Sequence, residues 1–197
     1  MFQVYKNFLL FLGVTVLLCI ISSIVWSKSK VKLVEIKLIN NLDDKRGFCV
    51  DIKGHKNRAK IERGLQAHTC YSYQGDIAVD QGLDANRLKQ KKLFFPNFNV
   101  CVHSPSYNKP LSLTLVKCKN TQEIIFYEDN TIRFKNNTYL CLTVAKKPSR
   151  KGRGGSPVHL IRNLSMQICN KNNLAYQTWV IRHIKNGMII KSKLSKF

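Results

Sequence analysis

The chain has 197 residues, of which 44% are hydrophobic, and a formal net charge of +22. Its length suggests one domain with additional segments, and its hydrophobic content excludes a chain that is disordered by composition. No acidic residue follows Asp129, whereas lysine and arginine continue to the end of the chain. This excess of positive charge attracts polyanions, namely acidic glycans, anionic lipid or nucleic acid. A basic surface that is simply solvated has the same composition.

The N-terminal segment contains a long apolar stretch. Residues 8–26 read FLLFLGVTVLLCIISSIVW and would extend about 28 Å as a helix, close to the thickness of a bilayer core. We therefore expect one N-terminal hydrophobic helix and a signal anchor or signal peptide over residues 1–27, and we favour the anchor because no clear cleavage site follows. The lysine residues after it favour a cytoplasmic domain, whereas the paired cysteines favour the extracytoplasmic side, which we prefer.

The next segments alternate as β-strands do. Residues 28–41 are expected to form a stalk and a first strand, because VEIKLI at 34–39 alternates between apolar and polar positions. Further short segments of this kind read VCVHS, LTLVKC, IIFY, YLCLTV, TWVIRHI and MIIKS. Turn-forming residues recur about every 8–12 residues, which is typical of an all-β barrel or sandwich.

Six of the seven cysteines fall into three pairs, whose members are 21, 17 and 28 residues apart. The pairs are Cys49 and Cys70, Cys101 and Cys118, and Cys141 and Cys169. None has the C-x2-C spacing of a zinc site, so we expect disulfides in an oxidising compartment and no metal. A bridge that closes within its own unit would stabilise the fold by about 3 kcal/mol in the chain-entropy model.

Each cysteine pair is followed by a triplet that begins with glutamine, and this combination defines three units. They occupy residues 48–92, 93–135 and 136–190 of a domain at 42–190, before a basic tail at 191–197. The triplet glutamine precedes the next unit's first cysteine by 20 residues (81 to 101) and then by 19 (122 to 141). Units of about 40 residues cannot each bury a hydrophobic face alone, so the three must pack together, as in a threefold closed barrel.

These features resemble the ricin-type β-trefoil lectins. The triplet QTW at 177–179 matches that family's Gln-x-Trp in full, while QEI at 122–124 and QGL at 81–83 are degenerate copies. The stretch 121–144 is similar to the junction between the first two units of a ricin B domain. The resemblance implies an all-β fold of the β-trefoil type with three pseudo-threefold repeats. It also implies that Gln177 of the full triplet bonds to backbone and that Trp179 packs in the core.

The resemblance also implies one sugar site, in the first unit. A carboxylate two residues after the first cysteine can accept two sugar hydroxyls at once, and Asp51 stands there. The corresponding site residues are Gln66, His68 in place of a larger aromatic, Asp80 in place of an amide, and the triplet glutamine Gln81. Imidazole offers less stacking area than Trp or Tyr, so the preference could shift away from a neutral galactose-type sugar toward a ligand with more donor groups.

A basic insertion lengthens the third unit. Residues 146–157 read KKPSRKGRGGSP, with glycines that favour flexibility. Its five cations are Lys146, Lys147, Arg150, Lys151 and Arg153. Clustered cations on an exposed loop suit sulfate, carboxylate or phosphate, which makes this segment a candidate anion site or a plainly solvated loop.

These observations favour a non-catalytic carbohydrate-binding module, anchored by residues 8–26 with the trefoil on the extracytoplasmic side. Its expected ligands are galactose-type or acidic glycans, and no cofactor is expected. The alternatives are a basic trefoil that binds sulfated or acidic glycans or anionic lipid through its C-terminal third, and a protein–protein adaptor. We expect no enzyme, because no companion catalytic domain accompanies the few carboxylates, and no nucleic-acid partner.

Overall fold

The computed structural model describes residues 31–105 and 112–192, which belong to one compact unit beginning at Val31. The expected anchor over 8–26 and the tail beyond residue 192 lie outside the described residues. Among the residues that are described, no helix is long and apolar enough to cross a membrane.

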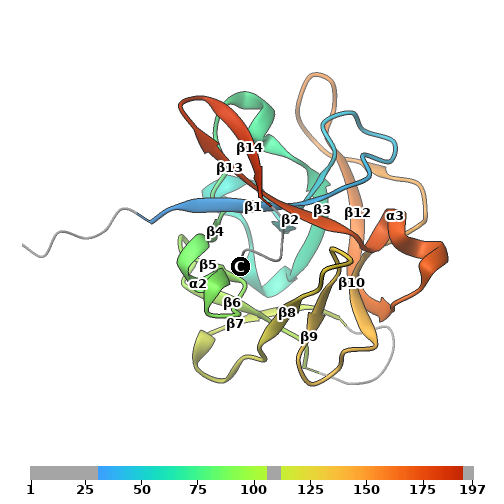
Figure 1. Cartoon of the computed structure of the whole chain (residues 1–197). Helices are drawn as coiled ribbons and strands as arrows, with labels where there is room; N and C mark the ends of the chain where they lie inside the picture. The colour runs from blue at the N-terminus through green and yellow to red at the C-terminus, as the bar shows by residue number, and fades with distance from the viewer. Residues whose placement is uncertain (1–30, 106–111, 193–197) are drawn as a thin grey trace, which may run out of the picture. The chain divides into compact units, whose positions relative to one another are not determined.

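The described chain consists mainly of short antiparallel strands that form a curled sheet with few helices (Figure 1). The strands are β1 (Leu33–Leu38), β2 (Phe48–Ile52), β3 (Leu65–Thr69), β4 (Leu83–Asp84), β5 (Phe94–Phe95), β6 (Val100–His103), β7 (Thr114–Val116), β8 (Ile124–Phe126), β9 (Ile132–Phe134), β10 (Leu140–Val144), β11 (Arg150–Lys151), β12 (Leu160–Ile168), β13 (Trp179–Lys185) and β14 (Met188–Ser192). The predicted all-β class is confirmed, and each strand segment named from the sequence coincides with an observed strand within about two residues.

The helices are short and lie between strands. They are α2 (Ala85–Lys89), α3 (Leu174–Gln177) and the 3-10 turns η1 (Lys56–Arg58), η2 (Ile61–Arg63), η3 (Tyr71–Gln74), η4 (Cys118–Asn120) and η5 (Lys171–Asn173). The side chain of Asp84 caps α2 by accepting bonds from the backbone amides of Asn86 and Arg87. The sequence patterns did not predict α2 and α3, which are too short to show a helical period.

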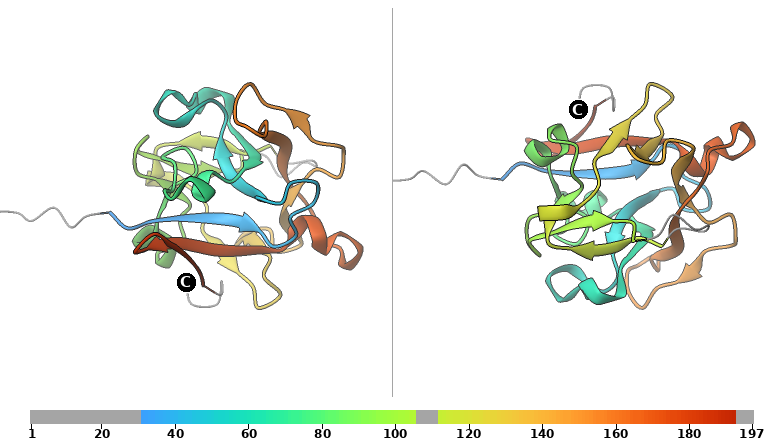
Figure 2. Two further views of the ribbon diagram at one scale, coloured as in Figure 1. Left: turned by 90° about the horizontal axis from the view of Figure 1, so that it is seen from above. Right: turned by 90° about the horizontal axis from the view of Figure 1, so that it is seen from below.

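The largest sheet contains nine strands. Its path runs β10-β12-β3-β2-β1-β13-β14, with β11 paired to β12 and β4 paired to β1. Two smaller sheets, β5-β6-β7 and β8-β9, complete the described strands. In both views of Figure 2, β1 and β13 run side by side, in agreement with their antiparallel register.

Three strand pairs, β2–β3, β6–β7 and β10–β12, share one register. In each, the first cysteine of a pair lies opposite the residue two positions before the second cysteine: Cys49 opposite His68, Cys101 opposite Val116, and Cys141 opposite Gln167. The three predicted disulfides are confirmed, each within its own unit: Cys49–Cys70, Cys101–Cys118 and Cys141–Cys169. Each bridge therefore ties the end of a hairpin strand back to its partner.

The core collects apolar side chains from all parts of the described chain. Trp179 is fully buried, as predicted, and its indole nitrogen donates to the backbone carbonyl of Leu142 at 2.9 Å. In β2, Val50 and Ile52 belong to this core, so Cys49 and Asp51 point to the opposite face of the strand. That second face is also buried, and it is where the candidate site lies.

Candidate functional site

The second buried face of the β2–β3 hairpin, opposite the face that holds Val50 and Ile52, brings several predicted site residues together. Asp51 lies directly opposite Gln66, and the Gln66 side-chain amide donates to Asp51 Oδ1 at 2.7 Å. His68 is two residues further along β3, on the same face. All three side chains are buried, and Asp51 is only 1% exposed.

The triplet glutamine Gln81 donates a hydrogen bond to the other carboxylate oxygen of Asp51. Its Nε2 donates to Asp51 Oδ2 at 3.1 Å and to the carbonyl of Thr69 at 3.1 Å. Its Oε1 accepts from the backbone amide of Tyr71 at 2.9 Å. Since both carboxylate oxygens accept amide protons and the group is buried, Asp51 does not present a free oxygen to a sugar hydroxyl in this arrangement.

Gln177 makes the same set of bonds in the third unit. It accepts from the amide after the second cysteine, Asn170, and donates to the carbonyl before it, that of Ile168. It also donates to Thr143 Oγ1 at 3.0 Å, and Thr143 stands where Asp51 stands in the first unit. In the second unit Gln122 instead bonds to the amide and carbonyl of Ser104. The residue at the position of Asp51 therefore accepts a hydrogen bond from the triplet glutamine, and the hydroxyl of Thr143 accepts the same bond in the third unit.

Asp80 lies close enough to Asp51 for their charges to interact. Its Oδ2 accepts from the backbone amide of Lys56, while Oδ1 is buried without a hydrogen-bond partner among the described residues. Burial raises the pKa of Asp51 well above its ordinary value, and the charge of Asp80 raises it further. Burial also raises the pKa of Asp80, against the effect of its hydrogen bond from Lys56. The two groups thus disfavour a doubly ionised state.

His68 belongs to a cluster of rings. Its ring stacks on Tyr71, with centroids 5.0 Å apart, and meets His159 edge-on at 5.2 Å. The Tyr73 hydroxyl lies 3.0 Å from His159 Nε2. Burial lowers the pKa of His68 to about 4, so its imidazole is neutral near pH 7. Burial, with the nearby Arg46 charge, also lowers the pKa of His159.

Gln66 and His68 line an open cleft of about 760 Å³. Its walls come from the segment after β2 and from the basic insertion, and the charged or titratable lining residues are Lys53, His55, Arg58, Lys60, Arg63, His68, Lys151, Arg153 and His159. None of the lining residues carries a carboxylate. Because six cations surround a floor of neutral polar side chains, the cleft suits an anionic ligand.

The predicted anion-binding residues divide into two groups. Lys151 and Arg153 line the cleft, whereas Lys146, Lys147 and Arg150 do not. Lys146 lies over the ring of Tyr176, the Lys147 carbonyl accepts from Arg162 at 2.6 Å, and Arg150 donates to Asn163. The wall residues from 53 to 63 were not predicted, although the run KGHKNRAKIER holds five cations and could have signalled them.

The glycines of the insertion build its turn against His159. Gly152 donates its amide to the His159 carbonyl at 2.7 Å, and the His159 amide donates to the Gly154 carbonyl at 2.9 Å. Gly155 has a φ of +91°, and a β-carbon there would come within 2.7 Å of the His159 ring. The insertion is therefore closed by hydrogen bonds, and glycine is required at 155 for both conformation and space.

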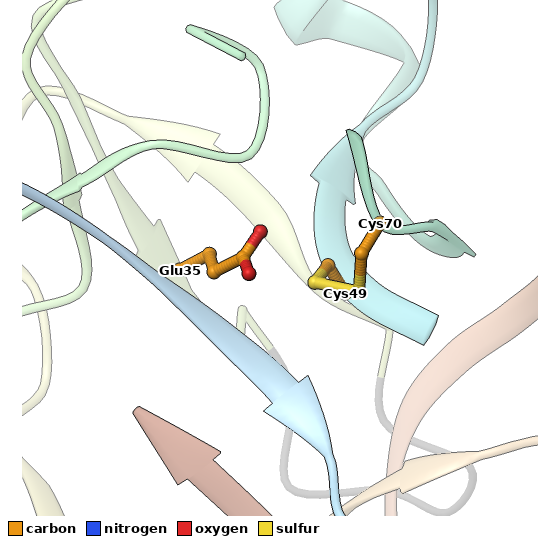
Figure 3. A group of neighbouring side chains, drawn as sticks. All are labelled: Glu35, Cys49 and Cys70. Carbon is orange, nitrogen blue, oxygen red and sulfur yellow. A yellow bond between two sulfur atoms is a disulfide. The ribbon is translucent and has the colours of Figure 1, made fainter. Parts of the chain in front are cut away.

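Glu35 points toward the Cys49–Cys70 disulfide, as Figure 3 shows. This is the one group of potential metal-ligand atoms found close together among the described residues. Both cysteines are oxidised, and a disulfide sulfur lacks the thiolate that binds a metal. Glu35 instead pairs with Arg182, whose Nη2 lies 2.5 Å from Glu35 Oε1.

No protein-family model matches the chain, and a search of curated proteins found no similar sequence.

Proposed function

We propose that this protein is a non-catalytic glycan-binding module of the ricin-type β-trefoil kind. The common register of three cysteine hairpins supports this assignment. So does the matching set of bonds made by Gln81 and Gln177. We place the trefoil on the extracytoplasmic side of a membrane anchored by residues 8–26, with which three disulfides are consistent.

We further propose that its ligand is an acidic glycan, bound in the cationic cleft. The observation that carries this proposal is the lining itself, with six lysine or arginine side chains and no carboxylate. A neutral galactose-type ligand is less well supported, because the oxygens of Asp51 accept from Gln66 and Gln81. Sulfate or carboxylate groups would meet the cations while Gln66 and His68 contact the sugar hydroxyls.

The same lining supports a binding role over a hydrolytic one. Glycoside hydrolysis needs two carboxyl groups on either side of the scissile bond. Asp51 and Asp80 are buried and neither lines the cleft.

Binding of a sulfated oligosaccharide and of its unsulfated parent, measured by calorimetry at about 50 mM and about 300 mM salt, tests the proposal. We expect binding of the sulfated compound alone, weakened by salt. The double variant Lys151→Glu/Arg153→Glu should weaken it by about tenfold to thirtyfold, taking about 0.7–1 kcal/mol for each reversed contact.

The matched control is Lys146→Glu/Lys147→Glu, which changes the net charge equally on the same insertion but outside the cleft. Equal losses in both variants would mean a diffuse charge effect and would contradict a cleft site. Tighter binding of the unsulfated sugar would instead support a site for a neutral sugar around Asp51 in the first unit. Failure to bind either compound would favour a protein–protein adaptor.

A further inference from the structure

Two arginine side chains hold the two ends of the basic insertion, residues 146–157. Arg162 lies on β12 and is only 7% exposed, and Arg46 lies in the turn that precedes β2. Neither of them lines the cleft, whereas Lys151 and Arg153 of the insertion do. The bonds of Arg46 and Arg162 therefore determine where the insertion lies, and its outer cations determine what it offers to a ligand.

Arg162 holds the start of the insertion. Its Nη1 donates to the backbone carbonyls of Lys147 at 2.6 Å and Ala145 at 2.9 Å. Its Nε donates to Ser149 Oγ at 2.7 Å. The carboxylate of Asp43 lies 2.9 Å from Nη2 and also accepts from Ser149 at 3.0 Å. Because the donors of a guanidinium lie in one rigid plane, these groups are held in one relative geometry.

Arg46 holds the end of the insertion in the same way. Its Nη1 donates to the carbonyl of Pro157 at 2.9 Å, and its Nη2 donates to the carbonyl of Val158 at 2.8 Å. Asp44 accepts from Nε at 2.9 Å and from Nη2 at 2.8 Å, so the pair is bidentate. Both guanidinium charges are thus neutralised by neighbouring aspartates while their donors bond to the insertion.

The turn that carries Asp43 and Asp44 also connects the insertion to the floor of the cleft. Asp44 Oδ2 accepts from the hydroxyl of Thr69 at 2.7 Å, and that hydroxyl accepts from the amide of Leu160 at 2.8 Å. Thr69 is the last residue of β3 and directly follows His68, which lines the cleft. One hydrogen-bonded network therefore joins the insertion, β12 and β3.

This network affects binding through Lys151 and Arg153. In a loop held at both ends, these two cations keep their places before a ligand arrives, so binding costs little ordering entropy. Fixed cations favour a ligand whose anionic groups lie at matching positions, and they leave charges unpaired on any other ligand. A loosely held loop would instead adapt to any polyanion.

We propose that Arg46 and Arg162 are positioning residues that hold the insertion as a preformed wall, and that the cleft therefore selects acidic glycans by where their anionic groups lie. This inference rests on the acidic-glycan function proposed above, and it narrows the ligand to a glycan with a defined pattern of sulfate or carboxylate groups. Lysine has the same charge as arginine but cannot replace either side chain, because an ammonium group lacks the planar set of donors.

Calorimetric binding of lactose disulfates tests the selectivity. The probes are positional isomers of equal charge that differ only in which hydroxyls are sulfated. We expect the parent to bind one isomer about tenfold more tightly than the others, and Arg162→Lys and Arg46→Lys each to reduce that ratio to about threefold or less. The matched control Arg133→Lys changes a guanidinium that bonds to Asp129 and to the Thr138 carbonyl outside the cleft, and it should keep the ratio.

The variant Asp43→Asn separates positioning from charge. The Asp43 side chain is 42% exposed, so its replacement disturbs the fold less than a change at the buried Arg162. Because Asp43→Asn makes the chain more positive, charge attraction alone predicts tighter binding of every isomer. A weaker hold on Arg162 predicts a smaller ratio between the isomers, which is the result we expect.

Hydrogen exchange without any ligand tests the hold on the insertion directly. The amide of Gly152 donates to the carbonyl of His159, and the amide of His159 donates to the carbonyl of Gly154. We expect Arg162→Lys and Arg46→Lys to accelerate exchange of these two amides by about tenfold or more, because the insertion opens more often. The control Arg133→Lys should leave their exchange unchanged.

Three outcomes would overturn the inference. Unchanged exchange of Gly152 and His159 in both arginine variants would contradict the hold on the insertion, whether or not a glycan binds. A parent that binds all isomers with equal affinity would contradict the selectivity and leave the acidic-glycan function standing. A parent that binds no isomer would contradict the acidic-glycan function and the selectivity together.

Discussion

Removing the carboxylate of Glu35 should destabilise the fold severely. Glu35 is fully buried, and Arg182, 8% exposed, contacts it at 2.5 Å through Nη2. The same Nη2 donates to Ser72 Oγ at 2.8 Å. The variant Glu35→Gln would leave the guanidinium buried beside Lys37, whose pKa is lowered to about 8, mainly by burial and next by Arg182.

The expected loss of unfolding free energy follows from the buried, unpaired guanidinium of Arg182 that remains after the substitution. Breaking a buried pair by removing one partner costs about 3–5 kcal/mol, because the other charge stays buried without compensation. Replacing both partners by apolar side chains of similar volume is often neutral, so Glu35→Leu/Arg182→Met should recover most of the loss. Against a total stability of about 5–15 kcal/mol, the single variant would lose a large fraction.

Urea unfolding of the parent, the single variants Glu35→Leu and Arg182→Met, and the double variant supplies the thermodynamic cycle, and Glu35→Gln is measured beside them. We expect the two single variants to lose several kcal/mol each and the double variant to lie within about 1.5 kcal/mol of the parent. A single variant that unfolds within about 0.5 kcal/mol of the parent would refute this account of the pair. So would a double variant as unstable as the sum of the two singles.

Three further substitutions address pH and backbone. Because burial raises the pKa of Asp51, the parent loses stability as pH rises from about 4 through that raised value. Asp51→Asn should lack this loss, so the difference in urea midpoint between variant and parent should change between about pH 4 and pH 7, and a constant difference would contradict the raised pKa. Burial first and the charge of Arg182 second lower the pKa of Lys37 in the folded protein to about 8. Above that pH the folded protein releases the Lys37 proton, whereas the unfolded chain still binds it. Stability of the parent should therefore rise between about pH 8 and pH 10, and Lys37→Met should reduce the rise; the lowered pKa of Lys53 accounts for a remaining part. Gly155→Ala should cost about 1–3 kcal/mol, because of the positive φ and the contact with His159; an unchanged melting temperature would contradict the strain.

Local sequence patterns predicted the hairpins well, because their information is local. A strand such as β10 or β14 shows its alternation within a few residues, and the Asn186-Gly187 turn, with φ of 51° and 73°, suits the two-residue loop between β13 and β14. The cysteine pairs joined as expected because each closes a short loop around one hairpin. The short helices were missed because four or five residues cannot display a helical period.

The structure brings the predicted residues Asp51, Gln66 and His68 onto one face of the β2–β3 hairpin, and whether they bind a ligand stays a prediction. The pairing of β2 with β3 places Asp51 opposite Gln66. The burial of Asp51 beneath the two glutamines does not follow from spacing, because it depends on where the triplet at 81–83 returns. The same holds for its raised pKa, which requires Asp80 and the surrounding chain.

The sequence by itself determined the all-β class, the three cysteine pairs and the excess of positive charge. Only the tertiary structure decided where that charge gathers. β12 pairs with β3, with Ile161 opposite His68, and this contact carries residues 151–159 to the wall formed by residues 53–63. Such long-range pairing depends on how the whole sheet closes, and the residue pattern of either segment does not show it. The two basic segments therefore line one cleft only because the folded chain brings them together.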